Sequence, residues 1–315
     1  MNKRWDIIGI GVVAVDDLLY LDHYPQPNEK IHVVMEKRQG GGLTGTALVA
    51  AARQGAKSAY CWRLGNDDLS VYSLQELERE GVDTSPCQFW VGNNPSHSII
   101  LVDMSSGSRT VLSNIKGVEE PDCLVITEDL IASSRVLFID HLAHQAGLQA
   151  AGFAHANGIP VVGDLESVTL PEMDSFLNMV DHLIISIDIA GAITQKQKVE
   201  EMVWELASPQ RAACVVTAGA QGCWYSEYGG IVYHFPAYRV NVVDTTGCGD
   251  VFHGVYAAAL ARGESVSRAV QLASASAALK ATHPGGREGI PDLVSVEKFI
   301  KTVDNPTKVD KNNPK

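Results

Sequence analysis

The sequence predicts an α/β fold in which a mostly parallel central sheet is covered by helices on both faces. Apolar segments with strand composition recur along the chain, and segments with helical periodicity separate them. Such alternation is typical of parallel sheets built from βαβ units. A hydrophobic content of 45% in 315 residues provides a large core, and α/β chains of this length commonly form one domain with insertions. We therefore predict a single domain over residues 1–303.

Each element follows from its local pattern of apolar residues. The strands predicted for the central sheet are residues 7–13, 59–64, 136–140, 160–163, 183–186 and 214–217. The helices predicted between them are residues 44–54, 71–80, 144–157 and 199–207. The C-terminal part is predicted to be helical at residues 251–261, 266–282 and 293–303.

Two segments, residues 20–37 and 96–112, break this alternation. Both have a half-polar pattern with a period of two, which is typical of strands with one exposed face, and residues 105–109 have the composition of a turn. We expect them to form a small β-sheet that acts as a lid over a binding site. The end of the chain, residues 304–315, is rich in Lys, Asn, Pro and Asp and is predicted to be disordered.

One segment, residues 243–254, suits phosphoryl transfer. Gly247 and Gly249 lie where an apolar strand turns into a helix, so the backbone can approach an anion and the first helical amides can point at it. Asp250 lies beside that point, where a carboxylate can accept the proton of an attacking hydroxyl. We expect the thiol of Cys248 to be reactive, because helix N-termini favour the thiolate. The alternative is a plain glycine turn before a buried helix.

The same segment resembles the second signature of the ribokinase-like, or PfkB, carbohydrate kinases, which reads roughly D-T-x-G-A-G-D. Cys248 stands where Ala is usual. The resemblance implies a ribokinase-like fold and ATP-dependent phosphorylation of a sugar hydroxyl. It also implies that Asp250 is the catalytic base and that Gly247, Cys248 and Gly249 form the anion hole for the transferred phosphoryl group.

Residues 39–47 resemble the first signature of the family. The resemblance implies that the amides of Gly41 and Gly42 bind sugar hydroxyls, and that Thr46 occupies the position of a sugar-binding Asn. A hydroxyl can donate and accept a hydrogen bond, but it cannot offer the forked donor and acceptor of an Asn amide. The set of sugar hydroxyls that Thr46 recognises is therefore expected to differ from the set that Asn recognises. Asp16, which we place in a turn after the first strand, is implied to hold two sugar hydroxyls.

The N-terminal segment also offers a rival interpretation, because residues 9–14 match the dinucleotide-binding pattern G-x-G-x-x-A. That pattern requires a helix immediately afterwards. Here Asp16, Asp17 and two prolines, Pro25 and Pro27, follow instead, which favours a strand and a loop.

Residues 214–225 form a predicted strand, a glycine loop and a second strand. The loop resembles the family's T-x-G-x-x-G nucleotide loop, which implies that Thr217, Gly219 and Gly222 approach ATP. The resemblance further implies a potassium site at Asp244 and Thr246, completed by carbonyls of residues 282–291, and oxygen ligands suit a hard cation. For Arg287, in that last loop, we leave open a contact with phosphate and a surface ion pair.

The magnesium site departs from the family pattern, because residues 186–189 lack the Glu of its N-x-x-E motif. Either another carboxylate orients Mg²⁺, with Asp164, Glu166 and Asp188 as candidates, or the ATP phosphates hold most of the ion.

The sugar itself is predicted only by class. Residues 240–291 are most similar to the ketohexose branch, which includes sulfofructose kinase, but residues 138–145 contain no Arg or Lys that could bind a sulfonate. We therefore expect a neutral ketose or a related monosaccharide. The alternatives are a nucleoside kinase on the same fold and a non-catalytic sensor of sugar or nucleotide. In this family the lid often forms a dimer interface, so we also expect a homodimer through the lid.

Composition excludes several other partners and compartments. A formal charge of −12 and a pI near 5.2 argue against a nucleic-acid partner. No apolar segment is long enough to cross a bilayer, so we expect no membrane association. The six cysteines are scattered without a C-x-x-C motif, which favours reduced thiols and a cytoplasmic protein.

Overall fold

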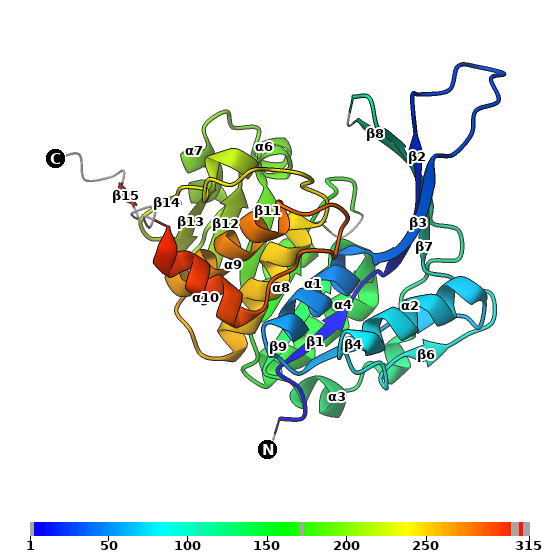
Figure 1. The fold of residues 1–315 in the computed structure, drawn as a ribbon. Coiled ribbons are helices and arrows are strands. Elements are labelled where there is room, and N and C mark those ends of the chain that lie inside the picture. The colour runs from blue at the N-terminus through cyan, green and yellow to red at the C-terminus, as the bar shows by residue number, and fades with distance from the viewer. Residues whose placement is uncertain (1–2, 107, 171–172, 304–308, 311–315) are drawn as a thin grey trace.

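The computed structural model describes residues 3–106, 108–170, 173–303 and 309–310. A nine-stranded central sheet has the order β15-β14-β13-β12-β11-β10-β9-β1-β4 (Figure 1). Its parallel part consists of β4 (Ser58–Cys61), β1 (Ile7–Ile10), β9 (Val136–Asp140), β10 (Val161–Asp164), β11 (His182–Ser186) and β12 (Ala213–Thr217). Three antiparallel strands extend it, β13 (Cys223–Glu227), β14 (Tyr233–Phe235) and β15 (Val309–Asp310). The predicted parallel sheet is confirmed.

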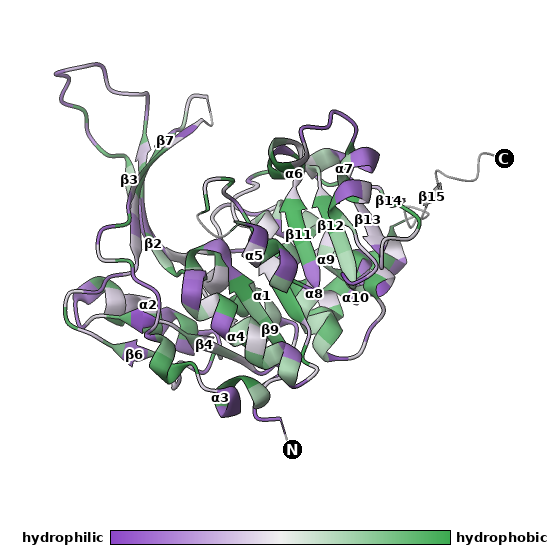
Figure 2. Cartoon of the chain, turned by 180° about the vertical axis from the view of Figure 1, so that it is seen from behind, coloured by the Kyte–Doolittle hydropathy of each residue, from purple (hydrophilic) through white to green (hydrophobic). Residues whose placement is uncertain are grey.

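The central strands lie in a continuous apolar core. Every residue of β1, β4 and β9 is buried, as expected for parallel strands covered on both faces. Figure 2 shows the central strands β11 and β12 as strongly hydrophobic. Among the described residues, no helix combines the length and the apolar character needed to cross a membrane.

Helices cover both faces of the sheet. The chain passes from β1 to β4 in one direction along the sheet and from β9 to β10 in the other. Right-handed crossovers therefore put the intervening helices α1 and α4 on opposite faces. On one of these faces, α1 (Leu43–Arg53) packs against α8 (Cys248–Ala261), α8 against α9 (Val266–Lys280), and α9 against α10 (Leu293–Thr302). The other helices are α2 (Asp68–Arg79), α3 (Glu128–Ala132), α4 (His144–Ala156), α5 (Met173–Met179), α6 (Ile187–Thr194) and α7 (Val199–Leu206).

Strand order reverses between β1 and β9, and a buried carboxylate holds this point together. Asp140, the last residue of β9, accepts hydrogen bonds from the Val12 amide at 2.7 Å and the Thr44 hydroxyl at 2.8 Å. Gly11 is required here, because a Cβ atom at that position would overlap both Asp140 and Thr44. No helix follows Gly11, so the dinucleotide-binding interpretation is wrong. In open α/β sheets, ligands bind at such a switch point.

The lid is a separate four-stranded sheet that projects from one side of the body (Figure 1). Its strands, in spatial order, are β3 (Met35–Gly41), β2 (Ala14–Leu21), β7 (Ser96–Asp103) and β8 (Arg109–Asn114). A two-stranded sheet of β5 (Arg63–Leu64) and β6 (Gln88–Phe89) lies elsewhere.

The predicted boundaries of the lid were wrong for its first half. Residues 20–37 are not one strand. The strands end at Leu21 and resume at Met35. Between them Pro25 and Pro27 cannot donate to a ladder, and Asn28 adopts φ 68°. The predicted disordered tail, residues 304–315, lies outside the described residues except for β15.

Gly254 allows α1 and α8 to cross closely, since a Cβ atom there would overlap the carbonyl oxygen of Ala47. We expect Gly254→Ala to lower the free energy of unfolding by about 1–3 kcal/mol because the two helices must separate. Gly152, inside α4, is the matched control, because its added Cβ would meet only Met179 Cε at 3.8 Å. Gly152→Ala should raise the free energy of unfolding by roughly 0.5–1 kcal/mol. Urea unfolding of both variants measures this, and equal effects would contradict the packing argument.

Candidate active site

The N-terminus of α8 presents free amides beside a carboxylate. Gly247, at the N-cap, adopts the left-handed conformation with φ 73°, and a Cβ atom there would lie 2.5 Å from the Gly286 carbonyl oxygen. No atom lies within 4 Å of a Cβ built on Gly249, so the space above it is open. The amide of Cys248 donates to the Thr245 carbonyl at 3.2 Å. This leaves the amides of Gly249 and Asp250 as the helix donors for an anion.

The expected reactivity of Cys248 is wrong. Its thiol turns toward α9 and donates to the Ala277 carbonyl at 3.5 Å. Burial raises the pKa of the Cys248 thiol, which outweighs the nearby ammonium of Lys280. The residue therefore fills space behind the anion-binding turn rather than presenting a thiolate.

Asp250 lies in the first turn of α8, half-buried. Burial raises the pKa of Asp250 well above its usual range, and the carboxylates of Asp164 and Glu166 raise it further. Arg287 opposes the rise. A carboxylate with a raised pKa is a stronger base than an ordinary Asp, and it can take a proton from a hydroxyl that approaches the open space above Gly249.

Two of the three candidate carboxylates for magnesium lie near Asp250. Asp164 ends β10 with 2% of its surface exposed, and its Oδ2 atom has no hydrogen-bond partner. Burial and Glu166 raise its pKa. Glu166 follows two residues later at the rim of the site, whereas Asp188 is exposed in the first turn of α6. His253 Nδ1 lies 3.6 Å from the Asp164 Oδ2 atom, beyond hydrogen-bond distance. A buried carboxylate oxygen without a hydrogen bond fits a hard cation or its bound water.

These carboxylates do not form a direct metal cage. Within residues 3–106, 108–170, 173–303 and 309–310, no three His, Cys, Asp or Glu side chains come together as metal ligands. The arrangement therefore fits an ion held largely by phosphate and water, with Asp164 and Glu166 as its protein partners.

Asp16 lies in β2, where the register of the sheet pairs it with Gln39 of β3 and Ser98 of β7. The prediction that it occupies a turn is wrong, because it lies inside a strand. Burial raises the pKa of Asp16, whereas hydrogen bonding to Ser98 and the charge of Arg287 lower it. A Cβ atom at Gly41 would lie 2.6 Å from the Asp16 carboxylate, so glycine there keeps the carboxylate accessible.

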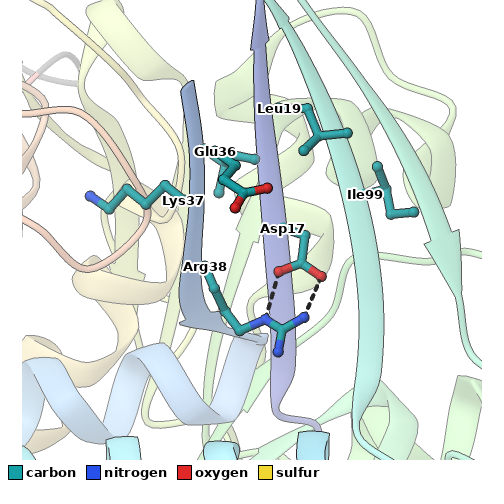
Figure 3. A pocket seen from close by; sticks show the side chains of 7 residues that line it. Asp17, Leu19, Glu36, Lys37, Arg38 and Ile99 are labelled. Atoms are coloured by element: carbon teal, nitrogen blue, oxygen red, sulfur yellow. Dashed lines mark hydrogen bonds and ion pairs between the residues drawn. The ribbon is translucent and has the colours of Figure 1, made fainter. Parts of the chain in front are cut away.

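Asp17, the next residue, points to the opposite face, as alternation along a strand requires. It forms a two-pronged ion pair with Arg38 at 2.6 and 2.8 Å (Figure 3). It also contacts His97 at 2.8 Å. Hydrogen bonding to Arg38 lowers the pKa of Asp17. A groove of about 490 Å³ runs along this outer face of the lid, and Ile99 also lines it. None of the predicted site residues lines this groove.

Arg287 was underestimated by sequence reasoning. It is not a surface ion pair, because only 8% of its surface is exposed and it lies against the predicted sugar-binding segment. Its Nη2 donates to the Gly41 carbonyl at 2.7 Å and its Nε to the Thr46 hydroxyl at 3.3 Å. Burial lowers the pKa of Arg287 to about 10, against the opposing effect of Glu76, Glu80, Asp16 and Asp250. One guanidinium thus interacts electrostatically with both predicted ends of the reaction site.

Gly42 and Thr46 lie at the start of α1. Gly42 is the N-cap with φ 84°, and a Cβ atom there would lie 2.6 Å from the Ala14 amide nitrogen. Thr46 is buried, and its hydroxyl accepts from Arg287. This bond uses one of the two lone pairs of the hydroxyl, which keeps its proton and a second lone pair for other partners.

The predicted nucleotide loop lies between β12 and β13, as expected. Thr217 ends β12, and its hydroxyl donates to the Ile185 carbonyl at 3.3 Å. Gly219 has φ 53° and open space around it, so it can be approached by a ligand. Gly222 has φ 92°, and a Cβ atom there would overlap the carbonyl of Phe235. Gly222 is therefore required by the turn itself.

The side-chain oxygens of Asp244 and Thr246, which are predicted to bind potassium, accept hydrogen bonds from within the protein. The Asp244 carboxylate accepts from the amide and hydroxyl of Thr246 at 2.8 and 2.7 Å and from the Gly285 amide at 2.9 Å. Arg109, in β8 of the lid, donates to the same carboxylate at 2.9 Å and also contacts the Thr246 hydroxyl. Burial alone would raise the pKa of Asp244, but these bonds and Lys280 lower it. At the place predicted for a potassium ion, the Asp244 carboxylate therefore pairs with a cationic side chain of the protein.

Comparison with known proteins identifies the family and the fold of the chain. Residues 10–293 match the family model described as "pfkB family carbohydrate kinase". The chain is 25% identical over 304 residues to the ribokinase of Haemophilus influenzae, covering 93% of this chain and 97% of that protein. It is 26% identical over 312 residues to the deoxyribokinase of Salmonella typhimurium, covering 94% and 98%.

A solved structure supports the fold. The ribokinase of Arabidopsis thaliana, complexed with ribose and ATP, superposes with a TM-score of 0.81 at 18% identity, covering 96% of this chain and 100% of the other. The predicted ribokinase-like fold, with its parallel sheet and separate small sheet, is confirmed. With the family model matching nearly the whole chain, the protein belongs to the pfkB family and is a carbohydrate kinase.

Proposed function

We propose that this kinase transfers the γ-phosphoryl group of ATP to a primary hydroxyl of a monosaccharide, a ketose or a related sugar. The observation that carries the proposal is Asp250, which lies in the first turn of α8 beside the amide donors of that turn and interacts electrostatically through Arg287 with the site of Asp16. A base, an anion site and a polyol site in one place are what transfer to a sugar requires.

In the proposed reaction Asp250 accepts the proton of the sugar hydroxyl as its oxygen attacks the γ-phosphorus. The bond from that phosphorus to the bridging oxygen breaks, and ADP leaves. The amides of Gly249 and Asp250 stabilise the negative charge on the transferred group. Mg²⁺ bound to ATP would neutralise phosphate charge, and Asp164 and Glu166 would hold it through water. Thr217 and Gly219 would contact the nucleotide.

The sugar would be bound by Asp16, by the amides of Gly41 and Gly42, and by Thr46. Ionised Asp16 only accepts hydrogen bonds, so it selects hydroxyl donors. Thr46 has its acceptor side turned to Arg287, so we propose that it donates to a sugar oxygen. The charge of Arg287 is balanced by carboxylates on both sides, which favours a neutral sugar.

We also propose a homodimer formed through the lid. Apolar side chains remain exposed on its strands and loops, among them Met35, Ile99, Leu112 and Ile115. An exposed apolar surface of this kind is typical of a protein interface. The outer groove beside Asp17 and Arg38 lies on the same sheet (Figure 3).

The cysteines support a cytoplasmic location for the protein, which we include in the proposal. All six cysteines are unpaired, and burial raises the pKa of Cys61, Cys214 and Cys223 to about 12. Unpaired buried thiols suit a reducing compartment.

The role of Asp250 can be tested directly. Asp250→Asn should lower kcat by roughly 10²–10⁴-fold with a much smaller change in KM, because loss of a general base acts on the transition state. Asp188→Asn, a matched change at an exposed carboxylate, should leave kcat unchanged. Steady-state ADP release measures both. Near-normal turnover of Asp250→Asn would refute the assigned role.

The substrate class can be tested with a panel of ketoses, pentoses, deoxypentoses and nucleosides, assayed by ADP release. The rate of Asp250→Asn with each compound is subtracted as the background rate. We expect the highest kcat/KM for a ketose, with weaker activity on the pentoses. A preference for nucleosides would overturn the proposed substrate class while leaving the catalytic residues in place.

The pH profile tests the electrostatic environment of Asp250. Because the base must be deprotonated, kcat/KM should fall on acidification through the raised pKa of Asp250. Glu166→Gln removes a negative charge that raises this pKa, so its acid limb should move to lower pH, whatever its effect on the maximal rate. Asp188→Asn again serves as the control. An acid limb that stays in place, or moves to higher pH, would contradict this assignment.

A further inference from the structure

Lys280, the last residue of α9, has an ammonium group inside the protein. None of its surface is exposed (0%). A buried ammonium is costly unless polar partners replace its water. The Nζ atom donates one hydrogen bond, at 3.0 Å, to the main-chain carbonyl of Asp244. Sequence reasoning missed this residue, although a lysine that ends a helix of small apolar residues was a signal.

The Lys280 ammonium lies close to the loop that forms the predicted anion site. Asp244 begins the loop that leads through Gly247 into α8, and Lys280 also interacts electrostatically with Cys248 and Asp250 of the first turn of α8. The ammonium thus lies behind the turn that holds the free amides. Burial lowers the pKa of Lys280, while Cys248 and Asp244 oppose that change.

Two positively charged side chains contact the residue that is predicted to bind potassium. Potassium sites in proteins are built from oxygens that replace the hydration shell of the ion. Here the Asp244 carbonyl accepts from Lys280, and the Asp244 carboxylate accepts from Thr246 and Gly285. The nearby Ala281 carbonyl accepts from the amides of Val243 and Asp244 at 2.8 and 3.1 Å. Arg109 also donates to the Asp244 carboxylate at 2.9 Å, so a potassium ion bound by Asp244 would lie beside the positive charges of both Arg109 and Lys280.

We propose that the Lys280 ammonium supplies the fixed positive charge behind the anion site, so that phosphoryl transfer by this protein is independent of potassium. The inference rests on the proposed function, because the charge is argued to act on the transferred phosphoryl group. Lys280 is a positioning residue. It holds the Asp244 carbonyl, and so the turn at Gly247, while its charge favours the anion bound by the amides of α8.

The first test compares turnover in potassium chloride and in choline chloride at equal ionic strength. The unmodified protein should turn over equally in both salts. Lys280→Met should lower kcat by about 10²–10³-fold in choline, as loss of a transition-state donor does, and potassium should restore roughly tenfold or more. Lys280→Arg, which keeps the charge, should retain more activity than Lys280→Met. Lys298→Met, at an exposed lysine of α10, is the control and should change nothing.

The second test does not depend on turnover. Stabilisation by ADP with magnesium is measured as the shift in Tm in each salt, since a ligand that binds only the folded state raises Tm. The shift should be equal in both salts for the unmodified protein, and larger in potassium than in choline for Lys280→Met.

Three outcomes would overturn the proposal. They are a potassium requirement in the unmodified protein, full activity of Lys280→Met in choline, and loss of activity in Lys280→Met with no response to potassium in either test. Failure to phosphorylate any sugar would refute the proposed function instead, because the Tm measurement needs no sugar. If Lys280→Met does not fold, the salt comparison on the unmodified protein and on Lys280→Arg still decides.

Discussion

The site depends on carboxylates gathered at one edge of the central sheet. Asp140 and Asp164 end adjacent parallel strands, and Asp250 approaches them from α8. Burial raises the pKa of each one, and repulsion from neighbouring carboxylates raises the pKa of Asp164 and Asp250 further. Such an arrangement is stable only where positive groups compensate, and it supplies both a base and partners for a cation of the nucleotide.

The compensating positive charges come from segments far away in the sequence. Arg287 reaches the sugar-binding segment from the loop after α9, and Lys280 supports the anion loop from the end of α9. Arg109 crosses from the lid to Asp244. The last contact connects the lid to the loop that precedes α8. Lid position and anion-site geometry are therefore coupled through one exposed ion pair, which salt weakens.

Successive side chains of β2 point to opposite faces of the lid sheet, so neighbouring residues have different surroundings. Asp16 faces Gln39 and Ser98 on the inner side, whereas Asp17 pairs with Arg38 on the outer side. A single-residue slip of β2 would exchange the two aspartates, so the register that pairs Asp16 with Gln39 is essential to the sugar site. The bonds of Asp17 to Arg38 and His97 help to hold this register.

The sequence alone determined the parallel sheet, most of its helices and the residues of α8 around Asp250, because periodicity and glycine-rich turns are local signals. Resemblance to a family also predicted Asp16, Gly41 and Thr46 as sugar ligands, which stays a prediction. The buried positions of Arg287 and Lys280, the turned-in thiol of Cys248 and the donors that meet the Asp244 carboxylate were decided only by tertiary structure. Each depends on which distant group meets a side chain in the interior, and burial and charge pairing of that kind leave no periodic trace in the chain.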